Sequence, residues 1–195
     1  MDLRNPVHAL IPTLEGPVFM ELASTSAPLT LAELHRRIAS ASKSGIRQAL
    51  GRMVDQGVVD IVPGGYVVNR EHIAFPAVEA MTDLRSVLAT RVRGLVLELD
   101  PDVIAVGFFG SYARRDGDTS SDIDILLVSD AKVLDDIAGV LAQRVHQWTG
   151  NDCHVVALNS RELRRAVRNG EAIVAEWQRE LELVAGSRDC LMSKP

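Results

Sequence analysis

Two carboxylates placed two residues apart could hold a metal ion in this chain. Asp122 and Asp124 lie at the start of an apolar run that ends at Val128, and this run predicts a β-strand. Because side chains alternate between the two faces of a strand, both acids project to one side, roughly 6.5 Å apart along the chain. Ile123 and Ile125 then point the other way, into a core. Paired carboxylates suit a hard divalent cation such as Mg²⁺ or Mn²⁺, which takes oxygen ligands and keeps substrate phosphates in its shell.

A glycine–serine pair upstream could bind those phosphates. Gly110 has no Cβ, so the backbone can come close to a ligand there. Ser111 begins a predicted helical turn, where N–H groups and the helix dipole favour an anion. A phosphate site facing a metal-binding pair is what nucleotidyl transfer requires, because the metal neutralises charge on the phosphate oxygens. The residues therefore predict a phosphate-containing ligand and a divalent metal.

The two motifs together resemble a known family. Gly110-Ser111-Tyr112-Ala113-Arg114, followed by Ser121-Asp122-Ile123-Asp124-Ile125-Leu126-Leu127-Val128, is similar to the signature of the DNA polymerase β-like nucleotidyltransferase superfamily, and most similar to its minimal prokaryotic members. The resemblance extends from about Val92 to Leu183 and implies that Asp122 and Asp124 ligate Mg²⁺ and take part in catalysis. The residues that it assigns to nucleotide binding are Gly110, Ser111, Arg114, Arg115 and Ser121.

The same residues also allow interpretations without any catalytic or binding role. The string also fits an ordinary turn followed by a buried strand with a solvated acidic edge. Arg115 departs from the family, since many members have glycine there, and Arg114 and Arg115 also fit solvated loop arginines.

The third carboxylate of the family has no direct counterpart. The resemblance places that acid, which deprotonates the attacking hydroxyl, on a later strand that corresponds to Cys153–Leu158, where His154 stands. Asp152 lies two residues earlier, on the same face if the strand extends that far, and could substitute. A neutral histidine could also act as a base. The alternative is a partly buried strand histidine with no chemical role.

Composition sets broad bounds. The chain has 195 residues, of which 47% are apolar, so one or two packed domains are expected. It has no apolar run long enough for a transmembrane helix and no signal peptide pattern at its start. Two cysteines make neither a disulfide framework nor a zinc site, so the cytoplasm is the expected compartment, without membrane contact. Residues 1–70 contain 7 Lys and Arg against 6 Asp and Glu, whereas residues 71–195 contain 14 against 20, which disfavours broad nucleic-acid binding by the second part.

The first 70 residues resemble a winged helix-turn-helix domain. Apolar spacing predicts helices over residues 13–24, 31–39 and from residue 43 to Gly57, with Thr30 and Glu33 forming a capping box on the second. Residues 58–62 and 66–68 then predict a hairpin around Pro63-Gly64-Gly65. The string from Ser44 to Val59 is similar to the recognition helix and wing entry of prokaryotic winged-helix regulators.

That resemblance implies that the third helix contacts DNA. The candidate DNA-binding residues on its polar side are Lys43, Ser44, Arg47, Gln48 and Arg52. The alternative is a solvated face on a protein-docking or dimerisation module, and the absence of Lys and Arg between Val58 and Asn69 weakens minor-groove contact.

The whole chain is predicted to be an α+β protein in four segments. These are the winged helix-turn-helix domain (1–70), a linking helix interrupted early by Pro76 (71–99), a nucleotidyltransferase α/β domain with a mixed sheet (100–186) and a frayed tail (187–195). The linking helix could pair with its copy in a homodimer or pack on the sheet. Within the third segment, strands are expected at 103–109, 123–128 and 154–158. Helices are expected at 132–149, from Arg161 with Ser160 as its cap, and from Gly170 to Glu180.

The sequence therefore predicts a Mg-dependent nucleotidyltransferase that moves NMP from an NTP to an unknown acceptor. Small members of the superfamily act in toxin–antitoxin pairs, where they modify a partner protein or a tRNA end, so a protein or RNA acceptor is expected. The alternative is not enzymatic: a degenerate nucleotidyltransferase domain that senses nucleotide and adjusts a DNA-binding winged-helix regulator.

Overall fold

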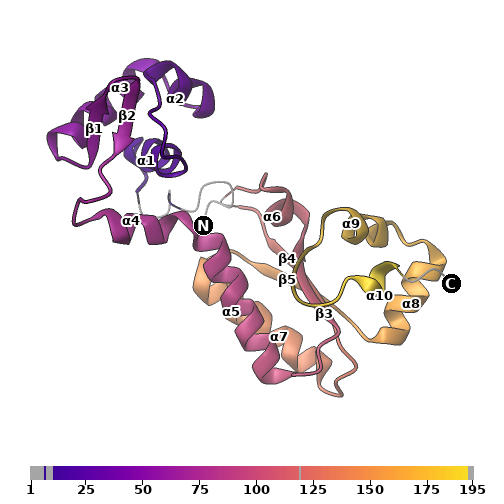
Figure 1. Cartoon of the computed structure of the whole chain (residues 1–195). Helices are drawn as coiled ribbons and strands as arrows, with labels where there is room; N and C mark the ends of the chain where they lie inside the picture. Colours follow the sequence, from indigo (N-terminus) through magenta and orange to yellow (C-terminus); the bar gives the residue numbers. More distant parts are fainter. Residues whose placement is uncertain (1–6, 8–10, 119, 193–195) are drawn as a thin grey trace. The chain divides into compact units, whose positions relative to one another are not determined.

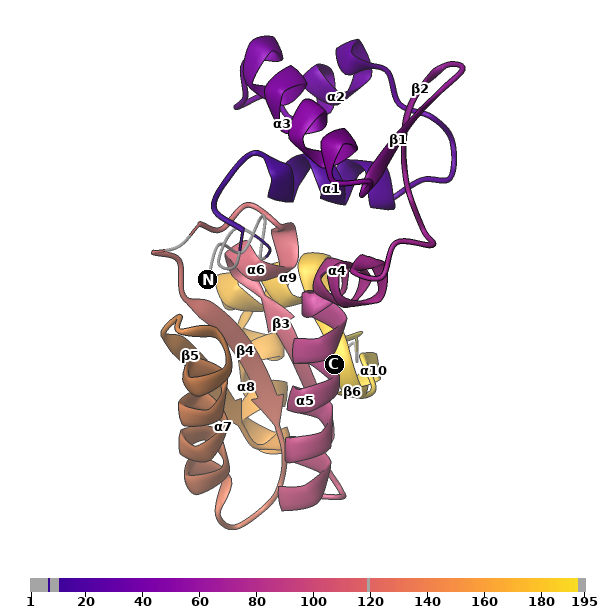
Figure 2. The ribbon, with the colours of Figure 1, turned by 90° about the vertical axis from the view of Figure 1, so that its left-hand side faces the viewer.

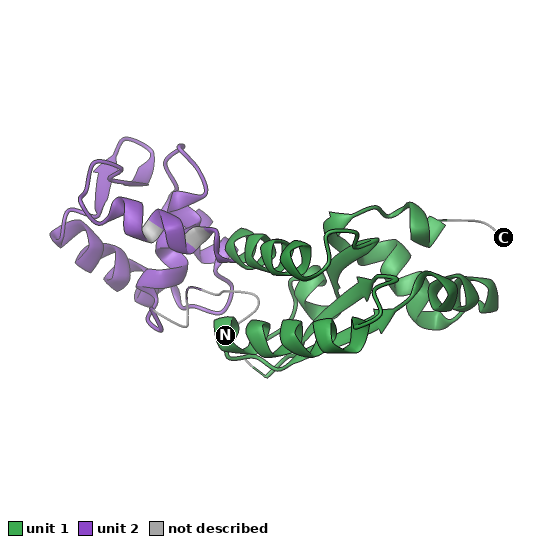
Figure 3. Ribbon diagram, turned by 90° about the horizontal axis from the view of Figure 1, so that it is seen from below, with its two compact units in different colours: residues 1–4, 85–195 green, residues 5–84 purple. Residues whose placement is uncertain are grey.

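The chain divides into two compact units. A computed structural model describes residue 7 and residues 11–118 and 120–192. Residues 5–84 form one unit, and residues 85–195, together with 1–4, form the other (Figure 3). They are called the N-terminal unit and the C-terminal unit below.

The N-terminal unit contains the three helices and the hairpin that the sequence predicts. Its elements are α1 (Glu15–Ala23), α2 (Leu31–Arg37), α3 (Lys43–Asp55), β1 (Val59–Val62), β2 (Gly65–Val68) and α4 (Phe75–Thr82), and β1 pairs antiparallel with β2. Thr30 caps α2 as expected: the Glu33 N–H donates to Thr30 Oγ1 at 3.2 Å, and the Thr30 N–H donates to the Glu33 carboxylate at 2.8 Å. The order of elements is the predicted one, while the winged-helix assignment stays a prediction.

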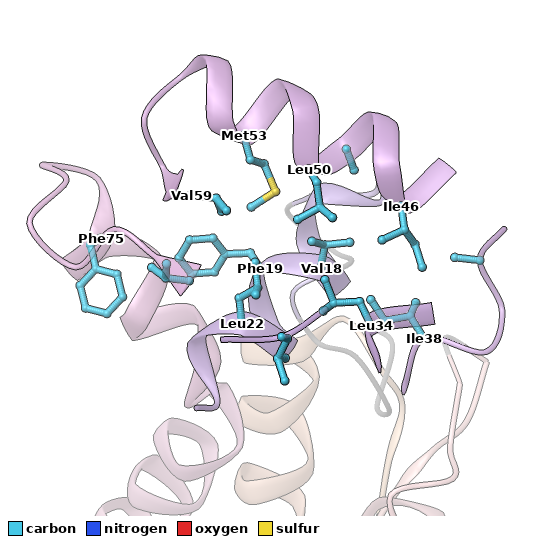
Figure 4. Close-up of a cluster of buried hydrophobic side chains, with 14 residues drawn as sticks. Val18, Phe19, Leu22, Leu34, Ile38, Ile46, Leu50, Met53, Val59 and Phe75 are labelled. Carbon is cyan, nitrogen blue, oxygen red and sulfur yellow. The ribbon is translucent and has the colours of Figure 1, made fainter. Parts of the chain in front are cut away.

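One hydrophobic core holds this unit together (Figure 4). Val18 and Leu22 of α1 meet Ile46 and Leu50 of α3, and all four are at most 1% exposed. Leu34 of α2 completes the cluster. Burial of one such side chain contributes about 1.5–3 kcal/mol, so the three helices are held mainly by their apolar faces. The opposite face of α3, with Lys43 and Arg47, is left exposed.

The connector differs from the single interrupted helix that the sequence predicts. It forms α4 and a second helix, α5 (Leu84–Leu99), with the break at Asp83. Pro76 lies in the first turn of α4, where its missing N–H removes no helical hydrogen bond, so it starts a helix instead of interrupting one. Helix α5 packs on the sheet of the C-terminal unit through Leu88, Val92 and Val96. Packing on the sheet was one of the two roles expected for this helix, and pairing with its copy in a homodimer was the other.

The C-terminal unit is built on a four-stranded mixed sheet. Its strands are β3 (Ala105–Phe109), β4 (Ile123–Val128), β5 (Cys153–Leu158) and β6 (Glu182–Gly186), in the order β5-β4-β3-β6. β4 and β5 are parallel, whereas β3 is antiparallel to both β4 and β6. The helices are α6 (Gly110–Arg114), α7 (Leu134–Thr149), α8 (Ser160–Asn169), α9 (Ala172–Glu180) and α10 (Asp189–Met192). The mixed sheet and the α+β class are confirmed, but β6 was not predicted.

Helices cover both faces of this sheet (Figures 1 and 2). α5 and α7 pack on the face that carries Ile123 and Ile125. α8, α9 and α10 pack on the face that carries Leu126 and Val128. Since side chains alternate along β4, Asp124 belongs to the second face.

Three local expectations in the C-terminal unit are wrong. Asn159, and not Ser160, caps α8, because its Oδ1 accepts hydrogen bonds from the N–H groups of Arg161 and Glu162 at 3.0 and 2.9 Å. Gly170, with φ +62°, ends α8 in the left-handed conformation instead of starting α9. The expected frayed tail contains α10, where Leu191 is only 1% exposed and its carbonyl accepts a hydrogen bond from Gln178 at 2.7 Å. Residues 193–195 lie outside the described residues.

Crossing a bilayer would need a long apolar helix. Among the described residues, no helix has both the length and the apolar character for it.

Candidate active site

The paired carboxylates lie at the start of the central strand β4. Ile123 and Ile125 are fully buried, whereas Asp124 is half-buried and Asp122, just before the strand, is exposed. This alternation confirms the predicted strand and the inward direction of both isoleucines. Within the part of the chain that the structure describes, Asp122 forms no ion pair or hydrogen bond, so its carboxylate is accessible to a ligand.

Gly110 brings the predicted phosphate turn against the carboxylate pair. It follows Phe109, which pairs with Asp124 across β3 and β4. Its φ is +65°, and a Cβ there would lie 2.5 Å from Asp124 Oδ2. Glycine is therefore required for its left-handed backbone and for a close approach. The sequence predicted that a ligand would come close to the Gly110 backbone. In the structure, the group close to Gly110 is the Asp124 carboxylate.

His154 stands beside Asp124. The two residues are partners in the parallel register of β4 and β5, and His154 Nδ1 lies 3.9 Å from Asp124 Oδ1. The His154 side chain is 71% exposed, so it is not partly buried, as the alternative without a chemical role had assumed. Its imidazole is open to an acceptor on the side away from Asp124.

Asp152 is exposed, and its carboxylate makes one long contact. It lies 3.4 Å from Nδ1 of His146, near the end of α7, but that nitrogen also lies 3.1 Å from the Asn151 carbonyl, and the Asp152 side chain is 86% exposed. The Asp152 carbonyl accepts a hydrogen bond from the Ile123 N–H at 2.9 Å. The substitute role of Asp152 for the missing carboxylate stays a prediction.

Negative charge accumulates at this end of the sheet. Burial raises the pKa of Asp124 above its ordinary value, the charge of Asp122 adds to this rise, and His154 and Arg114 oppose it. Burial likewise raises the pKa of the Cys153 thiol to about 12, with further repulsion from Asp124 and Asp122. The larger cause, burial, disfavours any uncompensated charge, whereas the smaller one, repulsion between the carboxylates, is what a bound cation would relieve.

Ser111 is held in place by the residue that follows it. Tyr112 is 1% exposed, its ring centroid lies 4.5 Å from that of Phe108, and the Arg85 guanidinium lies 3.9 Å from the Tyr112 centroid. Burial raises the pKa of Tyr112 to about 12. Arg85 in turn donates a hydrogen bond to Glu182 at 2.8 Å. These contacts anchor α6 and so fix Ser111 at the end of β3.

Arg114 is held by three carboxylates. Its guanidinium donates hydrogen bonds to Asp116 at 3.1 Å, to Glu180 at 3.0 Å and to Glu176 at 3.5 Å. The hydrogen bond with Asp116 is the main reason why the pKa of Arg114 is raised. A triphosphate would have to compete with these acids, so the nucleotide-binding role of Arg114 stays a prediction.

Arg115 and Ser121 each have a structural role in the backbone around the site. Arg115 ends α6 with φ +61°, a left-handed conformation that favours glycine, which explains why family members often have glycine there. Ser121 Oγ accepts a hydrogen bond from the Asp118 N–H at 2.9 Å and donates to Asp118 Oδ1 at 3.2 Å. This closes the loop before β4. Nucleotide binding by either residue stays a prediction.

The donor set suits a hard cation. Asp122 and Asp124 offer carboxylate oxygens at an accessible strand end where negative charge is in excess. Nowhere in the described residues do three His, Cys, Asp or Glu side chains gather to hold a metal. The protein would thus supply two carboxylates and the nucleotide phosphates would supply further oxygens, which is the usual arrangement for Mg²⁺.

All five candidate DNA-binding residues are exposed on α3, and four of them form no ion pair among the described residues. These four are Lys43, Ser44, Arg47 and Gln48. Arg52 is 57% exposed, but its guanidinium forms an ion pair with Glu15 of α1. Its charge is therefore partly neutralised within the unit, and Lys43 and Arg47 are the stronger candidates for phosphate contacts.

Sequence reasoning missed the residues that support the site from a distance. Glu176 and Glu180 bind Arg114, and Arg85 and Glu182 flank Tyr112. None of them belongs to a recognisable motif. Only β6 left a signal, since the apolar run around Leu183 ends at Gly186 and could have predicted a strand.

The family model of the nucleotidyltransferase domain matches residues 89–192, more than half of the chain. This chain belongs to the nucleotidyltransferase domain family. The match includes every residue of the site described above except Arg85. No curated protein matches the chain.

Solved structures resemble part of this nucleotidyltransferase. A toxin–antitoxin structure with AMP-PNP is 19% identical, with a TM-score of 0.42 over 53% of this chain and 77% of that one. The toxin–antitoxin MntA-HepT is 17% identical, with a TM-score of 0.38 over 53% and 74%. A tri-AMPylated HEPN toxin of Shewanella oneidensis in complex with MNT antitoxin is 19% identical, with a TM-score of 0.37 over 53% and 74%. The family assignment rests on the family model.

Proposed function

We propose that this protein is a divalent-metal-dependent nucleotidyltransferase that moves NMP from an NTP to a hydroxyl group of a macromolecule. One observation carries the proposal. The Gly110 turn, the Asp124 carboxylate and His154 meet at one end of the sheet, although they come from β3, β4 and β5. Membership of the nucleotidyltransferase domain family supports this class of reaction.

The reaction is a displacement at phosphorus. The oxygen of the acceptor hydroxyl forms a bond to the α-phosphorus of the NTP, and the bond from that phosphorus to the oxygen bridging the β-phosphate breaks. Pyrophosphate leaves with the electron pair, and the hydroxyl proton passes to a base. Asp122 and Asp124 would hold Mg²⁺ or Mn²⁺, which supplies neutralising charge for the phosphate oxygens. The turn at Gly110 and Ser111 would orient the triphosphate through its N–H groups.

His154 would receive the proton. A neutral imidazole accepts a proton near neutral pH, and the exposed ring of His154 can face the acceptor hydroxyl. The Asp124 carboxylate, 3.9 Å away, would stabilise the imidazolium that results. Asp152, whose side chain is 86% exposed, is the alternative base.

Replacement of His154 tests this assignment. We expect His154→Ala to slow transfer by about a hundredfold or more, the usual contribution of a general base. We expect His154→Asp to raise Mg²⁺-dependent transfer, because a carboxylate offers the anionic oxygens that an imidazole lacks. If neither His154→Ala nor Asp152→Asn slows transfer, the base lies elsewhere.

Label transfer tests the proposed function itself. The protein is incubated with each α-labelled NTP, with Mg²⁺ or Mn²⁺ and with cell lysate, and labelled RNA and protein are separated. We expect label in one of these fractions with the wild type and none with Asp122→Asn/Asp124→Asn. Equal metal-dependent nucleotide affinity in wild type and variant would contradict the proposed site.

The replacement of the third carboxylate by His154 favours a second candidate function. In this case, the C-terminal unit would bind nucleotide without transferring it and would adjust DNA binding by the N-terminal unit through Lys43, Ser44, Arg47 and Gln48. Nucleotide binding without label transfer, together with duplex DNA binding that weakens in Lys43→Gln/Arg47→Gln and with added salt, would support this function. A salt-insensitive or absent interaction with duplex DNA would favour a docking module.

A further inference from the structure

Helix α8 carries a stripe of four arginines. Leu163 and Ala166 of this helix are at most 5% exposed and belong to the core beneath it. At about 100° per residue, the four arginines fall within an arc of about 100° on the exposed side, over a length of about 10 Å. These residues, which we call the α8 arginine stripe, are Arg161, Arg164, Arg165 and Arg168.

The guanidinium groups of the stripe form no close ion pair. In the described part of the chain, none of the four has a carboxylate within ion-pair distance, and their side chains make a single hydrogen bond, from Arg164 to Ser160 Oγ at 3.2 Å. The nearest acid in electrostatic effect is Asp130, which accepts a hydrogen bond from the Ser160 N–H and whose pKa is lowered mainly by that bond and to a smaller extent by Arg164 and Arg161.

Two other arginines of the same unit are neutralised, since Arg85 binds Glu182 and Arg114 binds three carboxylates. Arg93, Arg144 and Arg188 are exposed and form no ion pair among the described residues, but they lie on different elements and form no cluster in sequence. Residues 85–195 contain 14 Lys and Arg against 17 Asp and Glu, so acids are plentiful. An unpaired stripe within an acidic unit is a concentrated positive surface that a polyanion would neutralise.

The stripe and the candidate active site share one side of the sheet. Leu163 and Ala166 of α8 pack on Leu126 and Val128, which alternate with the same phase as Asp124. Val128 lies four residues, or roughly 13 Å, from Asp124. It pairs with Leu158, two residues before α8 begins, and β5 is the edge strand that carries exposed His154. The stripe lies on the outer side of α8, and α8 begins at the opposite end of β5 from His154. A chain of phosphates bound to α8 would therefore have to continue along β5, by at least the roughly 13 Å between Val128 and Asp124, to reach the carboxylates.

We propose that the α8 arginine stripe binds the phosphate backbone of a single-stranded RNA, whose terminal hydroxyl is the acceptor. This inference rests on the proposed function for the acceptor role, but not for the binding itself. Guanidinium groups match phosphate with two parallel hydrogen bonds, and a repeated anion is needed to engage four of them in a row. The RNA terminus supplies the hydroxyl that attacks the α-phosphorus in the displacement described above. Contacts with phosphates alone carry no sequence information, so binding does not depend on sequence.

Fluorescence anisotropy with a short labelled single-stranded RNA tests the surface. We expect the wild type to bind with an affinity that falls with salt, and Arg161→Gln/Arg164→Gln/Arg165→Gln/Arg168→Gln to bind at least about tenfold more weakly. The slope of log affinity against log salt should become shallower by about 3, the value for four phosphate contacts on a single strand. The same four positions changed to lysine should keep the salt slope, because lysine keeps the charge, but should bind more weakly than the wild type, because an ammonium group cannot make the two parallel hydrogen bonds of a guanidinium.

Two control variants locate the effect. Arg93→Gln/Lys132→Gln/Arg144→Gln/Arg188→Gln removes four exposed charges of the same unit outside α8, and it should change affinity less than about twofold. Lys43→Gln/Arg47→Gln removes charge from the candidate DNA surface on α3 and should lower RNA affinity less than the stripe variant does. Equal loss in the stripe variant and in either control, or no RNA binding by the wild type, would overturn the proposal. Competition by polyglutamate as strong as by unlabelled RNA would also overturn it, in favour of an acidic protein partner.

Nucleotide binding separates this proposal from the proposed function. The stripe variant should bind Mg²⁺–NTP as the wild type does, yet lose label transfer to RNA. Asp122→Asn/Asp124→Asn should bind RNA normally. If the wild type binds RNA through the stripe but does not label it, the acceptor role of RNA is contradicted, whereas RNA binding by the stripe is supported.

Discussion

At the scale of single residues, the site concentrates features that lower stability. Asp124 is a partly buried carboxylate next to a second acid, and its pKa is raised mainly by burial. Arg115 holds a left-handed backbone conformation that glycine would adopt more easily. A residue that serves only stability would avoid such burial and strain, so both are consistent with a binding site.

Replacing Asp124 by asparagine should stabilise the protein at neutral pH. A folded-state pKa above the ordinary value means that the protonated form favours folding, so stability is lost as the pH rises through the folded pKa. The amide side chain of the variant does not ionise and would avoid this loss. We expect urea unfolding followed by tryptophan fluorescence to show a more stable Asp124→Asn at neutral pH and no difference in acid below both pKa values. A less stable variant at neutral pH would mean that the contact with His154 outweighs the cost of burial.

Gly110 should not tolerate a methyl group. In Gly110→Ala, the new Cβ would lie 2.5 Å from Asp124 Oδ2 at a φ of +65°, so the carboxylate must move. The left-handed backbone alone should cost about 1–2 kcal/mol. We expect weaker binding of Mn²⁺–NTP together with a lower free energy of unfolding. Gly94→Ala is the control: it lies inside α5 with no atom near the new Cβ, and should stabilise by up to about 1 kcal/mol.

At the scale of elements, the helix caps decide where each segment begins. Thr30 caps α2 and Asn159 caps α8, and both form a complete capping box with a glutamate three residues later. The second cap places the first turn of α8 directly after β5, and so orients the helix that carries the arginine stripe.

Removal of the Asn159 cap should cost about 1 kcal/mol in the free energy of unfolding. Asn159→Ala leaves the N–H groups of Arg161 and Glu162 without their acceptor. Ser160→Ala removes a partly buried hydroxyl at the first position of the helix, which accepts a hydrogen bond from Arg164 and contacts Asp130 but caps no backbone N–H, and it should cost less than Asn159→Ala. Urea unfolding followed by tryptophan fluorescence compares the two. A larger loss of unfolding free energy in Ser160→Ala than in Asn159→Ala would mean that Ser160 caps α8, as the sequence predicted.

At the scale of the whole molecule, each unit has its own hydrophobic core. The N-terminal core is formed by α1, α2, α3 and the hairpin, and the C-terminal unit has one core on each face of its sheet. Both tryptophans of the chain, Trp148 and Trp177, lie in the C-terminal unit. Tryptophan fluorescence thus reports on that unit, whereas circular dichroism reports on the helices of both.

A cavity in the N-terminal core should not change the unfolding midpoint measured by tryptophan fluorescence. Leu34 is fully buried, so Leu34→Ala should cost about 2–5 kcal/mol in its unit. We expect the circular dichroism transition to broaden or shift to lower urea, while the fluorescence midpoint stays where it is. Leu141→Ala, at an equally buried position in the C-terminal unit, should shift the fluorescence midpoint. If Leu34→Ala shifts both signals together, the two units unfold as one.

The sequence by itself determined the elements that depend on near neighbours. The strand of Ile123–Val128, the turn at Gly110, the capping box of Thr30 and the hairpin were all predicted, because their causes are apolar periodicity, a backbone preference or a hydrogen bond a few residues away. The nucleotidyltransferase family was identified for the same reason, since its motif is local.

The tertiary structure alone decided which of these residues meet. The contact of Gly110 with Asp124 follows from the register of β3 and β4, and that of His154 with Asp124 from the register of β4 and β5. Arg114 finds Glu176 and Glu180 more than 60 residues away. Strand register and ion pairs at this separation depend on how whole layers pack, and a local pattern of residue types contains no information on that packing.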